Sequence, residues 1–125
     1  GTVRAEGSTP IRITSDNSAQ IISGGNGNDT LVGTGSDTLT GGAGSDVFGF
    51  SGKGRYVITD FDKAGDKLAF DIAGVSTVDN LKAMVTSVVK TSGSITYHLG
   101  ADTSVTLVGV SASDLTASMI QLSIS

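Results

Sequence analysis

A short pattern rich in Gly and Asp recurs three times between residues 24 and 48. The copies span residues 24–31, 33–39 and 41–48, and the middle copy is one residue shorter. Each copy places its aspartate, Asp29, Asp37 or Asp46, two residues before an apolar residue. Glycine permits the backbone conformations of a tight loop, and the apolar residue begins a short strand. The repeat therefore predicts stacked loop-and-strand units, against the alternative of a flexible Gly/Ser linker.

The pattern G-G-x-G-x-D-x-U-x, in which U is a large apolar residue, resembles the calcium-binding nonapeptide of RTX (repeats-in-toxin) proteins. Haemolysin-type toxins, serralysin-type metalloproteases, bacterial adhesins and mannuronan C5-epimerases carry such repeats. The resemblance implies an all-β fold, a parallel β-roll in which two nonapeptides form one turn. It also implies Ca²⁺ between stacked loops, and Ca²⁺ suits such loops because it accepts oxygen ligands in flexible geometry.

Extending the nine-residue spacing in both directions predicts two apolar columns, one for each sheet of the β-roll. The first contains Ile13, Leu31 and Phe48, and the second contains Ile22, Leu39 and Val57. Residues 6–14 and 15–23 fit the spacing but lack glycine loops, so we expect degenerate turns there. The β-roll is predicted to span residues 1–58, with its calcium-binding repeats at 24–49.

Loops one turn apart on the same edge are the expected metal site. The loops 24–29 and 41–46 lie on that edge, and the segment 59–64 follows them. The resemblance assigns the following residues to calcium: Gly24, Gly25, Asn26, Gly27, Asp29, Gly41, Gly42, Ala43, Gly44 and Asp46, with Asp60 in a second site. The stretch from Asp60-Phe61 to Asp66 resembles the acidic segment that follows RTX repeats, although Asp60, Asp62 and Asp66 are also typical of turns and caps.

Asp37 falls on the opposite edge of the predicted β-roll. Arg55 follows it 18 residues later, so its guanidinium is expected to lie one turn above the carboxylate. Asp37 is therefore expected either to bind a cation or to pair with Arg55.

Residues 59–125 are predicted to form a β-rich C-terminal cap with one short helix. We expect a strand at 67–72, a helix that begins at Thr77 and follows an apolar stripe to Val89, and a helical turn at 111–117. Strands are expected at 94–99, 105–110 and 119–124, the first two as an antiparallel hairpin. The last residues resemble the C-terminal region of RTX exoproteins, which carries a type I secretion signal.

Composition excludes several classes of function. The chain has one His, no Cys and no constellation of nucleophile and base around its many Ser and Thr residues, so we predict that it is not an enzyme. Its net charge is −4 and its basic residues are scattered, which gives no reason to bind nucleic acid. No apolar stretch is long enough to span a membrane.

Two functions remain open. In the first, the chain is a calcium-dependent folding module of a longer bacterial exoprotein, with upstream domains before Gly1, export by a type I secretion apparatus and an extracellular location. In the second, it is a carbohydrate-binding module in which Lys53, Arg55, Tyr56 and Lys63 contact an anionic polysaccharide such as a polyuronate. The acidic net charge and the scarcity of aromatic residues favour the first function.

Overall fold

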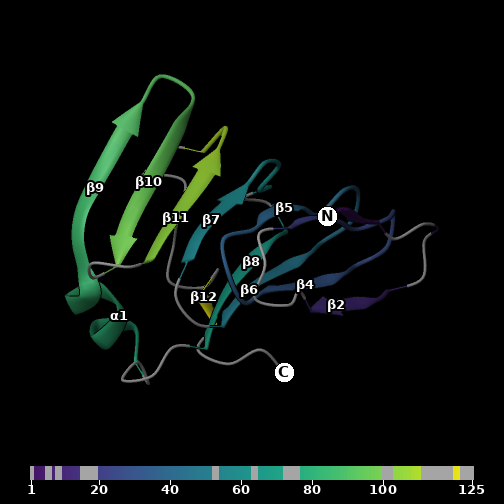
Figure 1. Cartoon of the computed structure of the whole chain (residues 1–125), viewed down its shortest axis with the longest axis horizontal. Coiled ribbons are helices and arrows are strands. Elements are labelled where there is room, and N and C mark those ends of the chain that lie inside the picture. Colours follow the sequence, from purple (N-terminus) through teal and green to yellow (C-terminus); the bar gives the residue numbers. More distant parts are fainter. Residues whose placement is uncertain are drawn as a thin grey trace.

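Two β-sheets pack face to face in the computed structural model of the chain (Figure 1). The structure describes residues 2–4, 7, 10–14, 20–51, 54–62, 65–71, 77–99, 103–110 and 120–121. The first sheet contains, in spatial order, β1 Thr2–Arg4, β3 Ile21–Ser23, β5 Thr38–Thr40, β7 Gly54–Ile58, β11 Thr103–Val108, β10 Ser94–Leu99 and β9 Val85–Thr91. The second contains β12 Ile120–Gln121, β8 Lys67–Asp71, β6 Val47–Ser51, β4 Thr30–Gly33 and β2 Arg12–Thr14.

The chain changes sheet at every strand from β1 to β8. Odd-numbered strands enter the first sheet and even-numbered strands enter the second, and neighbours from this part of the chain run parallel. This alternation is a parallel β-roll, so the predicted fold class is confirmed. The short strands leave the glycine-rich loops at the edges of the two sheets.

The pairing register confirms most of the two apolar columns. Ile13 pairs with Leu31, which pairs with Phe48, and Ile22 pairs with Leu39. The next position in the second column was predicted wrongly, because Leu39 pairs with Ile58 and Val57 pairs with Thr38. The five-residue strand β6 and its connection to β7 add one residue to the nine-residue spacing, which moves Ile58 into the core.

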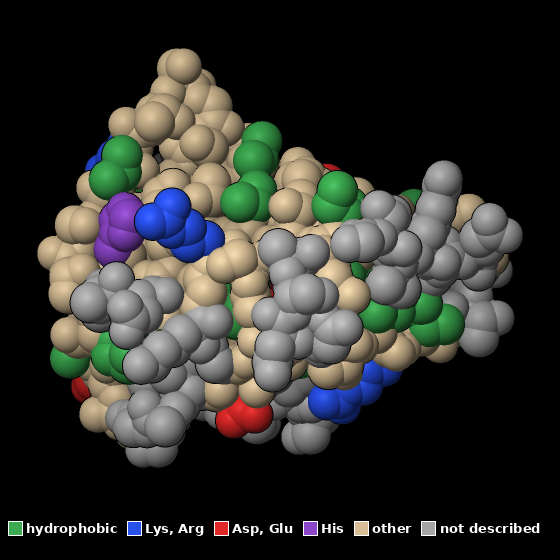
Figure 2. Space-filling view, in the orientation of Figure 1, with side chains coloured by type: hydrophobic (Ala, Val, Ile, Leu, Met, Phe, Trp, Pro, Cys, Tyr) green, Lys and Arg blue, Asp and Glu red, His purple; other side chains and the backbone are tan. Residues whose placement is uncertain are grey.

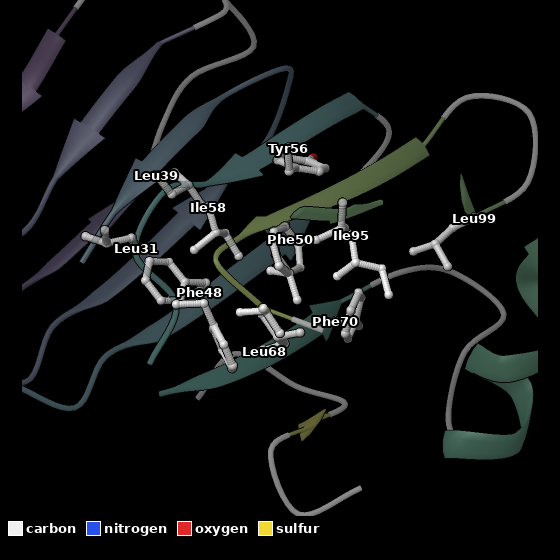
Figure 3. Packing of buried hydrophobic residues seen from close by; sticks show 14 of the residues in the cluster. Leu31, Leu39, Phe48, Phe50, Tyr56, Ile58, Leu68, Phe70, Ile95 and Leu99 are labelled. Atoms are coloured by element: carbon white, nitrogen blue, oxygen red, sulfur yellow. The ribbon is translucent and has the colours of Figure 1, made fainter. Parts of the chain in front are cut away.

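One hydrophobic core lies between the sheets and continues into the second half of the chain. Figure 3 shows Leu31, Leu39, Phe48 and Ile58 of the β-roll at one end of this core, and Ile95 and Leu99 of the C-terminal half at the other. Phe50 lies between them, with ring centroids 4.9 Å from Tyr56 and 5.1 Å from Phe70. The β-roll and the C-terminal half therefore stabilise each other through shared apolar contacts.

The C-terminal half extends both sheets of the β-roll. Strand β8 pairs in parallel with β6, and β12 pairs with β8. Strands β10 and β11 form the predicted antiparallel hairpin, and β11 then pairs in parallel with β7. Sheet pairing thus continues across residue 58, the predicted boundary between the β-roll and the C-terminal cap.

The predicted helix is only half right. Thr77 is its N-cap, as expected, and accepts a hydrogen bond from the Asn80 backbone N–H at 3.0 Å. However, the helix α1 spans only Val78–Met84, and residues Val85–Thr91 form the edge strand β9. The β-branched residues Val85, Val88 and Val89 favour a strand, and pairing with β10 stabilises it.

Several predictions fall on residues outside the described part of the chain. These are the degenerate turn at 15–19, the helical turn at 111–117, the tail at 122–125, and the side chains of Lys53 and Lys63.

Candidate calcium site between stacked loops

The loops 24–29 and 41–46 lie directly on each other, as predicted. Gly42 and Gly44 adopt φ angles of +82° and +90°, which favour glycine. A Cβ atom at Gly42 would clash with the Gly25 carbonyl oxygen, and one at Gly44 would lie 2.6 Å from the Gly27 carbonyl oxygen. Carbonyl oxygens of the first loop therefore face the second loop across a gap that only glycine leaves open.

The remaining predicted residues of these loops lie around this contact. Gly24 and Gly41 stand over the Asp29 and Asp46 carboxylates respectively, and Gly41 is buried. Asn26 and Ala43 are exposed, and the Asn26 backbone N–H donates to the Gly7 carbonyl at 2.7 Å. Asn28, which the sequence analysis did not single out, links the loops, because its Oδ1 accepts from the Ser45 N–H at 2.7 Å.

Three buried carboxylates form a ladder beneath the loops. The Ile11 N–H donates to Asp29 Oδ1 at 3.1 Å, the Asp29 N–H to Asp46 Oδ1 at 2.8 Å, and the Asp46 N–H to Asp66 Oδ1 at 2.7 Å. We call Asp29, Asp46 and Asp66 the carboxylate ladder. Asp66 was expected only as part of an acidic segment, but its 20-residue distance from Asp46 places it one turn further along the same edge.

The second oxygen of each ladder carboxylate distinguishes Asp46 from its neighbours. The Gly25 N–H donates to Asp29 Oδ2 at 2.9 Å, and the Asp62 N–H donates to Asp66 Oδ2 at 2.9 Å. Asp46 Oδ2 is buried and has no hydrogen-bond partner among the residues that the structure describes. A buried carboxylate oxygen without a partner is costly unless a proton or a cation neutralises it.

The electrostatics of the ladder follow from this arrangement. Burial raises the pKa of Asp46 from its ordinary value of 3.8 to about 7, the hydrogen bond from Asp29 opposes the rise, and the charges of Asp66, Asp29 and Asp60 add to it. Burial also raises the pKa of Asp66. The ladder therefore concentrates negative charge where water cannot screen it.

Asp60 contacts the second loop through both carboxylate oxygens. Its Oδ1 accepts from the Gly41 N–H at 2.9 Å, and its Oδ2 accepts from the Gly42 N–H at 2.8 Å. The structure therefore brings Asp60 to the loop 41–46, where the sequence analysis expected a second ion.

The opposite edge contains Asp37. Asp37 accepts hydrogen bonds from the N–H groups of Gln20 and Thr34, at 2.9 Å and 3.2 Å. The one-residue register shift brings Tyr56 toward Asp37, whose charge adds to burial in raising the pKa of the phenol to about 12. Arg55, the predicted partner of Asp37, is exposed, and its backbone N–H donates to Ser36 Oγ.

The candidate polysaccharide contacts are not all on the surface. Tyr56 is 0% exposed and packs on Phe50, so its prediction as a surface contact was wrong. The register shift that moves Ile58 inward also places Tyr56 two residues earlier on the same core face. Arg55 is exposed on β7, and Lys53 and Lys63 lie outside the described residues.

The oxygen atoms around the stacked loops suit a hard cation. Among the described residues, no three side chains of His, Cys, Asp or Glu form a metal-ligand group. An ion between the loops would instead draw on backbone carbonyl oxygens, such as those of Gly25 and Gly27, and on the free Asp46 Oδ2. A set of neutral carbonyl oxygens with a carboxylate suits Ca²⁺, which would supply the charge that the ladder lacks. The individual ligands remain a prediction.

Comparison with a family model identifies the repeats. Residues 15–48 match the model of the RTX calcium-binding nonapeptide repeat (4 copies). The chain therefore carries RTX calcium-binding repeats in a parallel β-roll, and the predicted resemblance and the calcium cofactor are confirmed.

Two solved structures share this fold over nearly the whole chain. The AlgE6R3 subunit of the mannuronan C5-epimerase from Azotobacter vinelandii is 26% identical, with a TM-score of 0.59, over 96% of this chain and 79% of that one. The extracellular lipase LipA from Serratia marcescens is 26% identical, with a TM-score of 0.58, over 96% of this chain and 21% of the lipase. No curated protein matches the sequence. In the described part of the chain, no helix is long and apolar enough to cross a membrane.

Proposed function

We propose that this calcium-binding RTX module folds when it binds Ca²⁺ outside the cell and thereby stabilises a larger exoprotein. The observation that carries the proposal is Asp46 Oδ2, a buried carboxylate oxygen beside the stacked loops for which the described part of the chain supplies no hydrogen-bond partner. In the absence of a cation, folding must bury this carboxylate next to Asp29 and Asp66, either charged or after it takes up a proton. Binding Ca²⁺ would remove that cost, so the free energy of ion binding would become free energy of folding.

The Ca²⁺ affinity expected of such sites indicates where the module folds. Extracellular calcium modules bind at about 10⁻⁴ to 10⁻³ M, which is far above the concentrations at which cytosolic calcium sensors work. A module with such sites would stay unfolded inside the cell, pass through a type I secretion apparatus and fold on release. The extracellular lipase with this fold supports the proposed location. The match covers 21% of the lipase, which supports the proposal that such a module is one part of a larger exoprotein.

Calcium should therefore control the β-structure of the chain. In a chelator at neutral pH we expect loss of the β-roll or a clearly lower melting temperature, and millimolar Ca²⁺ should restore both. Circular dichroism and thermal melting measure the effect, with Mg²⁺ at equal concentration as the control because it tolerates carbonyl-rich, irregular sites poorly. Identical spectra and melting temperatures in chelator and in Ca²⁺ would refute the proposal.

A second candidate function is binding of an anionic polysaccharide. The mannuronan C5-epimerase subunit matches the chain over most of both lengths, which favours this alternative. The first sheet also places Arg55 and His98 in one cross-strand row on either side of the buried Ser104, because Arg55 pairs with Ser104 and Ser104 pairs with His98. Directly paired residues point to the same face of a sheet, and Figure 2 shows the single imidazole beside a Lys or Arg side chain.

Replacing Arg55 with Ala should weaken retention on polyuronate roughly fivefold, since one exposed charge contact contributes about 1 kcal/mol. Arg12→Ala is the matched control, because Arg12 is equally an exposed arginine but lies on β2 of the other sheet. Affinity electrophoresis at fixed Ca²⁺ compares the two variants. Equal retention of both variants and the parent chain would remove Arg55 from any polysaccharide site, whereas Lys53 and Lys63 would remain candidates.

A further inference from the structure

The inward-pointing aspartates follow a common hydrogen-bonding rule. One carboxylate oxygen accepts an N–H from the previous turn, and the other accepts an N–H three or four residues earlier in the same loop. Asp29, Asp37 and Asp66 obey this rule, with Gly25, Thr34 and Asp62 as their local donors. The rule holds on both edges of the β-roll.

Asp46 is the exception among these four residues. Its Oδ1 accepts from the Asp29 N–H, as the rule requires, but its Oδ2 has no partner in the described ranges of the chain. The local donor four residues earlier would be the N–H of Gly42, by analogy with Gly25 and Asp29.

The placement of the carboxylate does not explain the exception. A Cβ atom at Gly24 would lie 2.5 Å from Asp29 Oδ2, and a Cβ atom at Gly41 would equally clash with Asp46 Oδ2. The two carboxylates therefore stand in the same position beneath their loops. What differs is the local donor.

The local donor of Asp46, the Gly42 N–H, is hydrogen-bonded to Asp60. The Gly42 N–H donates to Asp60 Oδ2 at 2.8 Å, and the neighbouring Gly41 N–H donates to Asp60 Oδ1 at 2.9 Å. A backbone N–H that makes a short bond to one carboxylate is not available to a second. Asp46 Oδ2 therefore lacks its local partner because the Gly42 N–H donates to Asp60 instead.

We propose that Asp60 is a positioning residue that keeps Asp46 Oδ2 open for Ca²⁺ by holding the Gly41 and Gly42 N–H groups. This inference rests on the proposed calcium function. Asp60 acts through the loop backbone and through Asp46, so it selects which carboxylate of the ladder carries an oxygen that a cation can use. In Asp29 and Asp66, the corresponding oxygen already accepts a hydrogen bond from a local N–H group.

The inference predicts that the effect of replacing Asp60 on the Ca²⁺ midpoint depends on whether Asp46 is intact. In Asp60→Ala the Gly42 N–H becomes free to bond Asp46 Oδ2, so Ca²⁺ must displace that bond. The Ca²⁺ concentration at the midpoint of folding should rise about tenfold, the effect expected of one charge-assisted hydrogen bond. In a chain that already carries Asp46→Asn, Asp60→Ala should change the midpoint by less than about twofold, since the oxygen that it protects is gone.

The experiment is a double-mutant cycle of Asp60→Ala and Asp46→Asn, read as the Ca²⁺ midpoint of the circular dichroism signal. Asp62→Ala is the matched control, because it removes the same charge from the same segment, and the backbone N–H that Asp62 donates to Asp66 Oδ2 is retained in the variant. A change of the midpoint by Asp62→Ala as large as that by Asp60→Ala would show a general charge effect and overturn the proposal. Asp60→Asn, which retains one acceptor oxygen, gives a milder variant if Asp60→Ala does not fold.

The outcomes separate this inference from the proposed function. If the unsubstituted chain shows no response to Ca²⁺, the calcium-folding proposal itself fails. If the chain responds but Asp60→Ala shifts the midpoint equally with and without Asp46→Asn, Asp60 acts as a direct ligand or a simple loop anchor, and the positioning role is wrong. A shift that appears only when Asp46 is intact supports it.

Discussion

Replacing Gly42 with Ala should abolish or severely weaken calcium-dependent folding. The residue has a φ angle of +82°, and its added Cβ would meet the Gly25 carbonyl oxygen, which is backbone and cannot rotate away. A positive φ costs about 1–2 kcal/mol for a residue with a Cβ, and overpacking adds about 1–3 kcal/mol. The clash would also push apart the two loops whose carbonyl oxygens face each other. Melting temperature and Ca²⁺ midpoint measure the two effects.

The chain contains a matched control for this substitution. Gly109 has nearly the same φ angle, +81°, but no atom of the described residues lies within 4 Å of a Cβ at this position. Gly109→Ala should therefore incur only the backbone cost and leave the Ca²⁺ midpoint unchanged. Equal losses in the two variants would mean that the close approach of the loops contributes nothing to calcium binding.

The repeat made most of the β-roll predictable, because each nonapeptide contains its own loop and its own buried residue. Ile13, Leu31 and Phe48 could be aligned by counting alone. Counting failed at Val57, where a longer strand shifts the register, and it then misplaced Arg55 and Tyr56 together. Because of this one-residue error, Tyr56 was expected on the surface but is buried.

The C-terminal half was less predictable because tertiary contacts decide its structure. The apolar spacing from Val78 to Val89 fits a helix, but β10 offers a strand partner from Val85 onward. The parallel pairing of β11 with β7 joins residues about fifty positions apart, and no local pattern in the sequence indicates it.

The candidate site was predictable in its position but not in its hydrogen bonds. Spacing placed Asp29, Asp46 and Asp60 along one edge of the β-roll, and the structure brings them together there. Which backbone N–H each carboxylate receives depends on loop geometry at the level of single bonds. The open oxygen of Asp46 is therefore a finding of the structure.

Asp46→Asn should change stability in opposite directions with and without calcium. Asn keeps an oxygen for the Asp29 N–H but removes the buried charge, so at pH 7.5 in chelator the variant should be more stable than the parent chain. In millimolar Ca²⁺ the order should reverse, with a Ca²⁺ midpoint roughly tenfold higher for the variant, because the open carboxylate oxygen is lost. Asp71→Asn, at an exposed position on β8, is the control and should match the parent chain in both conditions.

The same carboxylate predicts the pH dependence of the calcium-free chain. The pKa of Asp46 is about 7 in the folded protein, above its ordinary value of 3.8, so the folded state binds the proton more tightly than the unfolded state. The stability that this proton contributes is complete below about pH 4 and is lost as the pH rises through about 7. Asp66, whose pKa is also raised, contributes with the same sign. Acidifying the chelator-treated chain from pH 7.5 to 5 should therefore increase its β-structure and melting temperature, and Asp46→Asn should reduce this gain to the part that Asp66 supplies. A calcium-free chain whose stability rises with pH over this range would show that Asp46 is not a buried, partnerless carboxylate in solution.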